Sequence, residues 1–163
     1  MRVLDIGAGP RSSADTQIDI FKWEKTTHVL DAMMEKLPFE DETFDEVRME
    51  QFLEHCPPSV HYKEDGVWKT HRPRIHVMKE SYRVLKHGGI LHVSVPAEIH
   101  EWAQDPTHEG PIILEGFFSY FCGEWGGAKQ GEFVNDAYGL DIAFEMIEHF
   151  RTGFILTVRM RKP

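Results

Sequence analysis

The first half of the chain alternates between short apolar runs and polar turns. Residues 2–6 are apolar and β-prone and lead into a glycine-rich turn, which is typical of a buried strand followed by a tight loop. Residues 17–20 and 28–30 predict further short strands, each next to an acidic residue. Residues 44–49 alternate imperfectly between apolar and polar side chains, but turns bound them on both sides. We therefore predict a central strand there as well.

The connection between the first two strands is short. Only nine residues, 10–18, lie between Gly9 and Asp19. A crossover between parallel strands generally needs about a dozen residues or more, because it holds a helix and its loops. The sequence therefore predicts a truncated first crossover.

The second half contains a helix, a strand and a hairpin. Residues 73–86 carry apolar side chains at helical spacing, with a proline near the start and a glycine pair after the end. Residues 90–95 predict the next strand, which a proline ends. Residues 140–150 and 154–161 predict an antiparallel hairpin. The apolar positions of the helix are Ile75, Met78, Tyr82 and Leu85.

Two segments show no regular period. Residues 56–74 mix prolines, a glycine, charges and histidines, so we predict a long insertion loop. Residues 97–139 are irregular and aromatic-rich, with one short helix predicted at 115–121, and we expect the substrate side here. The aromatic residues of this helix, together with Trp102 and Trp125, either wall a substrate pocket or belong to the core.

This order of elements predicts an α/β fold, which we expect to form a single domain over residues 1–163. Strands separated by helices or long connections through residue 95, followed by a hairpin, imply a mostly parallel sheet with one antiparallel edge strand. Ligands of such sheets bind beyond the carboxyl ends of the strands, where the strand order reverses. Those ends carry Gly7, Asp19, Asp31 and Gln51.

The composition restricts the partners of the chain. Its 163 residues, of which 41% are hydrophobic and 28% charged, are ordinary for a globular protein. The net charge of −9 argues against general affinity for nucleic acid, whose phosphates require a positive field. With two cysteines, no basic-then-apolar leader and no apolar run of membrane-spanning length, we expect a cytoplasmic location and no membrane partner. A small or neutral substrate fits better.

Three motifs follow one another along the chain. They are VLDIGAGP at 3–10, LPFEDETFDEV at 37–47 leading into FLEH at 52–55, and RVLKHGGILHVSVP at 83–96. With these motifs the chain resembles the class I S-adenosylmethionine-dependent methyltransferases, of the type 11 kind, with a shortened first loop and helix. The resemblance implies a Rossmann-like, doubly wound, seven-stranded sheet. It also implies S-adenosylmethionine as cofactor and S-adenosylhomocysteine as product.

The resemblance assigns residues to the methionine and ribose parts of the cofactor. Gly7 and Gly9 let the backbone approach the methionine portion, and a larger side chain at Gly7 is expected to block the site. Asp5 helps to orient the ammonium group, directly or through water. Asp19 matches the acid that accepts hydrogen bonds from both ribose hydroxyls. Its structural alternative is a turn at the end of the strand.

The resemblance also assigns residues to the adenine and the sulfonium. Asp31 and Ala32 match the pair that recognises the adenine edge, through a carboxylate that accepts from the exocyclic amine and an amide that donates to a ring nitrogen. Asp31 is alternatively a helix cap or turn residue. Gln51 follows the fourth strand, either under the expected position of the sulfonium or facing the surface.

Methyl transfer from a sulfonium needs positioning and a base, because the cofactor brings its own leaving group. His55, directly after the fourth strand, is the first candidate for this base, since imidazole titrates in the useful range. His108, in a polar cluster after the fifth strand, is the second. The alternative for the pair of Glu54 and His55 is a capping or scaffold role.

Other chemistries fit the sequence less well. Cys56 lies near the position of the nucleophile in cytosine-modifying methyltransferases, but its prolines follow it instead of preceding it. Residues 49–52 lack the Asn/Asp-Pro-Pro-aromatic element of amino-directed DNA methyltransferases, so we expect no nucleic-acid substrate. The neighbouring histidines match no paired-ligand spacing, and we predict no metal site. These histidines are His61, His71 and His76.

The sequence therefore predicts base-assisted, in-line methyl transfer to oxygen or nitrogen of a small-molecule or glycan acceptor. The glycan suggestion rests on the resemblance of the short-loop subgroup to sugar-modifying enzymes. A nicotinamide-dependent dehydrogenase is disfavoured, because residues 11–13 lack the third glycine that opens a helix. The alternative function is a non-catalytic module that binds S-adenosylmethionine or acts as a scaffold. The sequence determines neither the acceptor nor the oligomeric state.

Overall fold

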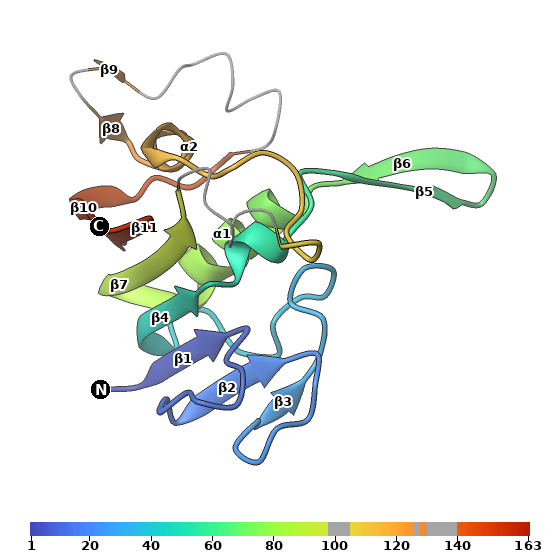
Figure 1. Cartoon of the computed structure of the whole chain (residues 1–163), viewed down its shortest axis with the longest axis horizontal. Coiled ribbons are helices and arrows are strands. Elements are labelled where there is room, and N and C mark those ends of the chain that lie inside the picture. The colour runs from blue at the N-terminus through green and yellow to red at the C-terminus, as the bar shows by residue number, and fades with distance from the viewer. Residues whose placement is uncertain (98–104, 126–127, 130–139) are drawn as a thin grey trace.

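Seven strands form the central sheet: β1 (Val3–Ile6), β2 (Thr16–Asp19), β3 (His28–Val29), β4 (Phe44–Glu50), β7 (Leu85–Pro96), β10 (Glu145–Thr152) and β11 (Ile155–Arg161). Their order across the sheet is β10-β11-β7-β4-β1-β2-β3 (Figure 1). The computed structural model describes residues 1–97, 105–125, 128–129 and 140–163. No helix in these ranges is long and apolar enough to cross a membrane.

The strand directions confirm the fold class predicted from the sequence. β1 lies between β2 and β4 and is parallel to both, and β4 is parallel to β7. β11 is antiparallel to β7 and to β10, which places the antiparallel strand next to this edge of the sheet. The chain runs outward from β1 to β3 and then returns to the other side of β1 with β4. The sheet is therefore doubly wound and Rossmann-like, and its order reverses at β1.

The sheet has one apolar and one polar face. On β7, Leu91, Val93 and Val95 are fully buried, whereas the side chains between them are half-buried and polar. The strand register aligns four polar side chains in one row across β1, β4, β7 and β11. These are Asp5, Arg48, His92 and Arg159. The imperfect alternation in the sequence of β4 follows from this one-sided burial.

Helix α1 (Pro73–Val84) packs against the apolar face of the sheet. Val77, Met78 and Val84 of this helix are buried in the same core as the apolar side chains of β4 and β7. The Tyr82 ring contacts the Phe144 ring edge to face, with centroids 4.9 Å apart. Residues 7–15 connect β1 to β2 without a helix, which confirms the truncated first crossover.

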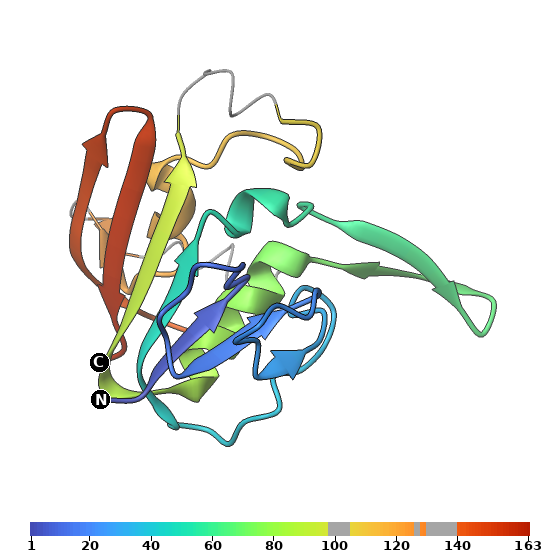
Figure 2. The ribbon, with the colours of Figure 1, turned by 60° about the horizontal axis from the view of Figure 1, so that its bottom comes forward.

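The sequence predicted an insertion loop at residues 56–74 but not the secondary structure within it. This segment contains a hairpin of β5 (Val60–Glu64) and β6 (Val67–His71), which projects away from the sheet (Figures 1 and 2). Most side chains of both strands are exposed, so the hairpin has no buried face and no apolar alternation in its sequence. The available signal was the Asp-Gly pair at the turn. Asp65 and Gly66 both have positive φ, as two-residue hairpin turns require.

The C-terminal half agrees with the sequence apart from element boundaries. After η1 (Leu53–His55) and α1, the short helix α2 (Glu115–Ser119) forms as predicted. The small strands β8 (Glu124–Trp125) and β9 (Ala128–Lys129) pair with each other. The predicted C-terminal hairpin is present, but β10 begins at Glu145 because the chain before it packs into the core. The part of the predicted irregular region at 98–104, 126–127 and 130–139, with Trp102, lies outside the described residues.

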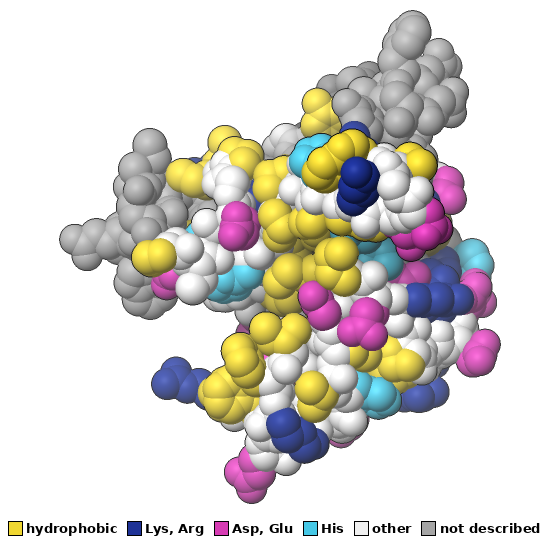
Figure 3. Space-filling view, turned by 90° about the vertical axis from the view of Figure 1, so that its right-hand side faces the viewer, with side chains coloured by type: hydrophobic (Ala, Val, Ile, Leu, Met, Phe, Trp, Pro, Cys, Tyr) yellow, Lys and Arg dark blue, Asp and Glu magenta, His cyan; other side chains and the backbone are white. Residues whose placement is uncertain are grey.

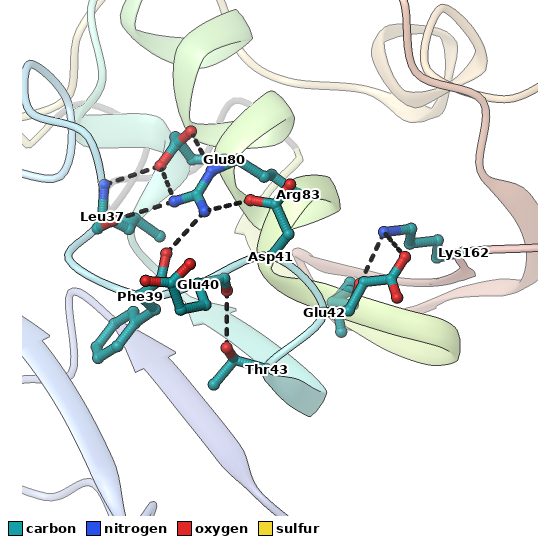
Figure 4. A network of polar contacts seen from close by, with 10 residues as sticks. Leu37, Phe39, Glu40, Asp41, Glu42, Thr43, Glu80, Arg83 and Lys162 are labelled. Atoms are coloured by element: carbon teal, nitrogen blue, oxygen red, sulfur yellow. Dashed lines mark hydrogen bonds and ion pairs between the residues drawn. The ribbon is translucent and has the colours of Figure 1, made fainter.

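Arg83, in the last turn of α1, ties this helix to the loop before β4 (Figure 4). Its guanidinium donates to both carboxylate oxygens of Glu80, at 2.9 and 2.7 Å, and to the Asp41 carboxylate at 2.8 Å. It also donates to the backbone carbonyls of Leu37 and Phe39. Burial alone would raise the pKa of Glu80, but the hydrogen bonds from Arg83 and from the Leu37 amide outweigh burial and lower it. This network anchors the first half of the chain to α1.

Replacing Arg83 with methionine is therefore expected to destabilise the fold by about 3 kcal/mol, because a largely buried carboxylate loses its charged partner. The measurement is urea unfolding at neutral pH. A lowered folded-state pKa stabilises the protein above the unfolded pKa, and this stabilisation is lost as the pH falls through the folded pKa. The difference in the free energy of unfolding between wild type and Arg83→Met should consequently become smaller in acid.

The matched control is Arg161→Met, which breaks the exposed ion pair with Glu145. An exposed pair contributes about 0–1 kcal/mol, so this variant should unfold close to the wild type. Equal destabilisation of the two variants would show that the network around Arg83 has no special role.

Candidate functional site

A cavity of about 490 Å³ lies at the carboxyl ends of β1, β2 and β4. Its size is within the range of small-molecule sites, about 300–1,000 Å³. The face toward which the β5–β6 hairpin projects carries hydrophobic side chains in its centre, with acidic and histidine side chains around them (Figure 3). The residues lining the cavity are Gly7, Ile18, Asp19, Ile20, Phe21, Trp23, Leu30, Ala32, Met33, Gln51, Phe52, His55 and Thr107.

The loop after β1 forms one wall of the cavity. The amides of Gly7 and Ala8 both donate to the carbonyl of Ile18, at 3.0 and 3.1 Å, which holds the loop on β2. Gly7 has φ +69°, and a Cβ atom there would lie 2.3 Å from Cδ2 of Phe52. Only glycine therefore fits between the backbone and the Phe52 ring. The steric requirement at Gly7 comes from the neighbouring protein side chain.

Asp19 ends β2 and lines the cavity with a carboxylate that is already hydrogen-bonded. One oxygen accepts from the Gly9 amide at 2.9 Å and the other from the Phe21 amide at 2.8 Å. Each carboxylate oxygen has a second lone pair, so the group retains capacity to accept from a ligand. Asp19 therefore stabilises a turn at the end of the strand, which was its structural alternative, and also lines the cavity.

Ala32 and Gln51 line the cavity from the ends of β3 and β4. Gln51 has φ +54°, a strained conformation for a residue other than glycine, and its amide donates to the Ser94 carbonyl at 2.9 Å. The Gln51 side chain contacts the Ser94 hydroxyl at 3.3 Å. Backbone strain of this kind, held by bonds to the neighbouring strand, is common in functional sites.

Three other predicted residues support the lining from outside it, as far as the described residues show. Asp5 is buried and accepts from the Ser12 hydroxyl at 2.5 Å, and burial raises its pKa. Gly9 donates to Asp19. The Asp31 carboxylate accepts from the Met33 amide at 2.9 Å within a turn, which is the turn role considered for it.

The two candidate bases lie together at one rim of the cavity. His55 belongs to η1, and its Nδ1 is 3.1 Å from the carbonyl oxygen of Thr107. The rings of His55 and His108 are in edge-to-face contact, with centroids 4.8 Å apart. Partial burial and the neighbouring His55 lower the pKa of His108. The structure thus brings together the two histidines that the sequence proposed separately.

Glu54 and Cys56 flank His55 and are both buried. Burial raises the pKa of Glu54 to about 7, although the charge of Arg74 opposes this shift. Burial also raises the pKa of the Cys56 thiol to about 12, so this cysteine remains protonated at neutral pH. A thiol of that kind is a poor nucleophile, in agreement with the sequence argument against Cys56.

The aromatic residues in and directly after α2 divide between core and surface. Phe118 and Phe121 are buried in the core, whereas Tyr120 is half exposed. A second cavity, of about 540 Å³, borders this helix. Its lining is Pro58, Arg72, Arg74, Ile75, Pro111, Phe117, Tyr120, Phe121 and Leu140. Burial confirms the core alternative for Phe118 and Phe121, and the alternative of a substrate pocket stays a prediction.

The hydrophobic lining of the main cavity was not predicted. Ile20, Phe21 and Trp23 follow β2 and remain 53%, 61% and 37% exposed, although they are large and apolar. Three such residues directly after an acidic strand end are a sequence signal for a ligand wall, because exposed apolar clusters commonly mark binding sites. Phe52 lines the cavity because of the turn at Gln51, and no comparable pattern in the sequence predicts this.

Comparisons with known proteins agree with this architecture. A family model described as a methyltransferase domain matches residues 4–93, more than half of the chain. No curated protein matches the sequence significantly.

Several solved structures are similar in fold. A S-adenosylmethionine-dependent methyltransferase from Archaeoglobus fulgidus has a TM-score of 0.58 and 15% identity, over 99% of this chain and 86% of that one. The N-methyltransferase NodS from Bradyrhizobium japonicum, solved with S-adenosyl-L-homocysteine, has a TM-score of 0.51 and 15% identity, over 99% and 78%. A Burkholderia thailandensis 1,6-didemethyltoxoflavin-N1-methyltransferase has a TM-score of 0.55 and 14% identity, over 98% and 70%.

The match to the family model includes β1, β2, β3 and β4 with the loops that form the cavity, and the fold of the whole chain agrees with it. The chain therefore belongs to the class I S-adenosylmethionine-dependent methyltransferase family.

Proposed function

We propose that the cavity binds S-adenosylmethionine and that the protein transfers its methyl group to oxygen or nitrogen of a small-molecule or glycan acceptor. The observation that carries this proposal is the meeting of Gly7, Asp19, Gln51 and His55 in one cavity at the reversal of strand order. The net charge of −9 supports an acceptor other than nucleic acid. We further propose that residues 1–163 act as one domain.

The binding mode follows from the positions of the strand ends. Asp19 accepts hydrogen bonds from the ribose hydroxyls with the lone pairs that the Gly9 and Phe21 amides leave available. Ala32, beside Asp31, lies at the adenine end. The apolar side chains after β2 cover the adenosine, as aromatic and aliphatic walls do in most small-molecule sites. Asp5 acts from beneath the loop, through Ser12 or water, because Ser12 already donates to its carboxylate.

The chemistry takes place at the rim formed by His55. S-adenosylmethionine supplies an activated methyl group, so the protein has to align the acceptor and remove its proton. The carbonyl of Thr107 can only accept a hydrogen bond, so Nδ1 of His55 carries the proton and Nε2 retains a lone pair. A neutral imidazole in this tautomer is a base for the acceptor proton. His108 is the second candidate for the same role.

The first test addresses Asp19. Asp19→Asn keeps the size of the side chain, removes its charge and leaves only one oxygen to accept from the Gly9 or Phe21 amide. It should weaken S-adenosylhomocysteine binding by about 1.5–3 kcal/mol. Isothermal titration calorimetry measures this change. Asp15→Asn, an exposed acid in the same loop, is the matched control and should bind normally. Unchanged affinity of the Asp19 variant would remove this residue from the site.

The second test addresses the glycine loop. Gly7→Ala should destabilise the protein by about 1–3 kcal/mol and lower S-adenosylhomocysteine affinity, because the new Cβ forces the Phe52 ring to move. Gly9 also has positive φ, but a Cβ added there would meet no neighbouring atom. Gly9→Ala should therefore have only the cost of backbone strain. Denaturation and calorimetry compare the two variants. The double variant Gly7→Ala with Phe52→Ala removes the two ring atoms that would lie 2.3 and 2.7 Å from the new Cβ, so it should regain part of the affinity. An absence of recovery would contradict the steric explanation.

The third test addresses turnover. His55→Ala should reduce transfer of a labelled methyl group to candidate small-molecule and glycan acceptors by about 10²–10⁴-fold while leaving S-adenosylhomocysteine affinity nearly intact. His61→Ala, on the projecting hairpin, is the control. Equal loss of affinity and turnover would make His55 structural. Binding of the cofactor by the wild type without transfer to any acceptor would favour the scaffolding module instead.

A further inference from the structure

Glu54 is a buried carboxylate without a hydrogen-bond partner. The residue is 5% exposed, and neither of its carboxylate oxygens has a partner in the structure. Arg74 lies close enough to influence it, but the guanidinium of Arg74 donates to the carbonyls of Cys56, Glu109 and Pro111. Buried polar groups are almost always satisfied, so an exception of this kind calls for a missing partner.

His55, the next residue, has the hydrogen bond that metal-binding histidines typically have. Its Nδ1 donates to the Thr107 carbonyl at 3.1 Å, which fixes the tautomer and leaves the lone pair on Nε2. In metal sites the second ring nitrogen of a histidine ligand almost always donates to a carboxylate, carbonyl or water. The hydrogen bond to Thr107 therefore orients the His55 ring before any ion binds.

His108 completes a group of three. One possible ligand atom from each of Glu54, His55 and His108 lies within 4.8 Å of the other two, and no other such group occurs in the part of the chain that the structure describes. Bonds of about 2.0–2.2 Å to one ion place its ligand atoms somewhat closer together, at about 3.3 Å. Binding of an ion would therefore draw the three side chains closer together.

We propose that Glu54, His55 and His108 bind a divalent transition-metal ion, of the Zn²⁺ type, at the rim of the cofactor cavity. Two imidazoles and one carboxylate are a ligand set of zinc enzymes and of other transition-metal sites that keep open positions. The ion would provide the partner that the Glu54 carboxylate lacks. The sequence alone predicts no metal site, because the histidines that suggested one were His61, His71 and His76, whose spacing matches no paired-ligand pattern.

The position of the group indicates what the ion would do. His55 and Thr107 line the cavity, so an open coordination position borders the space next to the cofactor. This part of the proposal rests on the proposed methyl transfer. An acceptor hydroxyl bound to the ion would be held in place and become more acidic, and it would release its proton to solvent water. In that case His55 would act as a metal ligand and not as the base. The acceptors favoured by this arrangement carry a hydroxyl or carboxylate oxygen that can coordinate a metal.

The test uses Co²⁺ as a spectroscopic probe and Zn²⁺ in calorimetry with the purified, metal-free protein. We expect one equivalent of metal to bind, with visible Co²⁺ absorption bands. Glu54→Gln and His108→Ala should each weaken binding by at least about 100-fold, since loss of an outer partner alone costs about 10–100-fold. Glu54→Gln is a small change and His108 is only half-buried, so both variants should fold. Circular dichroism checks this.

The matched control is His76→Ala. The rings of His71 and His76 have centroids 5.1 Å apart and form another histidine pair that can attract metal ions. The proposal is overturned if the wild type binds no metal, or if His76→Ala removes the binding while Glu54→Gln and His108→Ala retain it.

Labelled methyl transfer with metal-free and metal-loaded protein separates this proposal from the proposed function. Transfer that depends on added metal supports the role of the ion, whereas equal transfer without metal overturns that role. If neither form methylates any acceptor, the proposed function fails, and the Co²⁺ spectra still decide whether the metal site exists.

Discussion

The short connection from β1 to β2 is the constraint on which the rest of the structure depends. Residues 7–15 have no helix with which to return to the sheet, so hydrogen bonds to β2 hold the loop instead. The amides of Gly7 and Ala8 donate to Ile18, and the amide of Gly9 donates to Asp19. The loop consequently lies over the strand ends and packs against Phe52 at Gly7, and both residues line the cavity.

The missing helix also explains the two-faced sheet. Sheets with parallel strands are usually covered by helices on both faces and have apolar residues throughout. Here α1 packs on one face, while Arg48 and His92 belong to a polar row on the other. Polar side chains on that face avoid the free-energy cost of exposing apolar surface. The alternation along β4 and β7 therefore agrees with a sheet that, within the described residues, α1 covers on one face.

The same groups shape the fold and form the site. Asp19 holds the loop after β1 through Gly9 and presents its remaining lone pairs to the cavity. Gln51 adopts a strained turn after β4, which places Phe52 against Gly7 and leads into the helical turn with His55. Binding residues that are held by backbone hydrogen bonds need little reorganisation when a ligand arrives, and such preorganisation increases affinity.

The sequence by itself determined the strands, α1, the short first crossover and the acids at the strand ends, because these depend on local patterns of burial and on turn residues. It did not determine the β5–β6 hairpin, whose strands bury no face. Only the tertiary structure decided that Glu54 is buried without a partner beside His55 and His108. His55 and His108 contact each other although they lie far apart in the chain, and no local sequence pattern encodes such a contact.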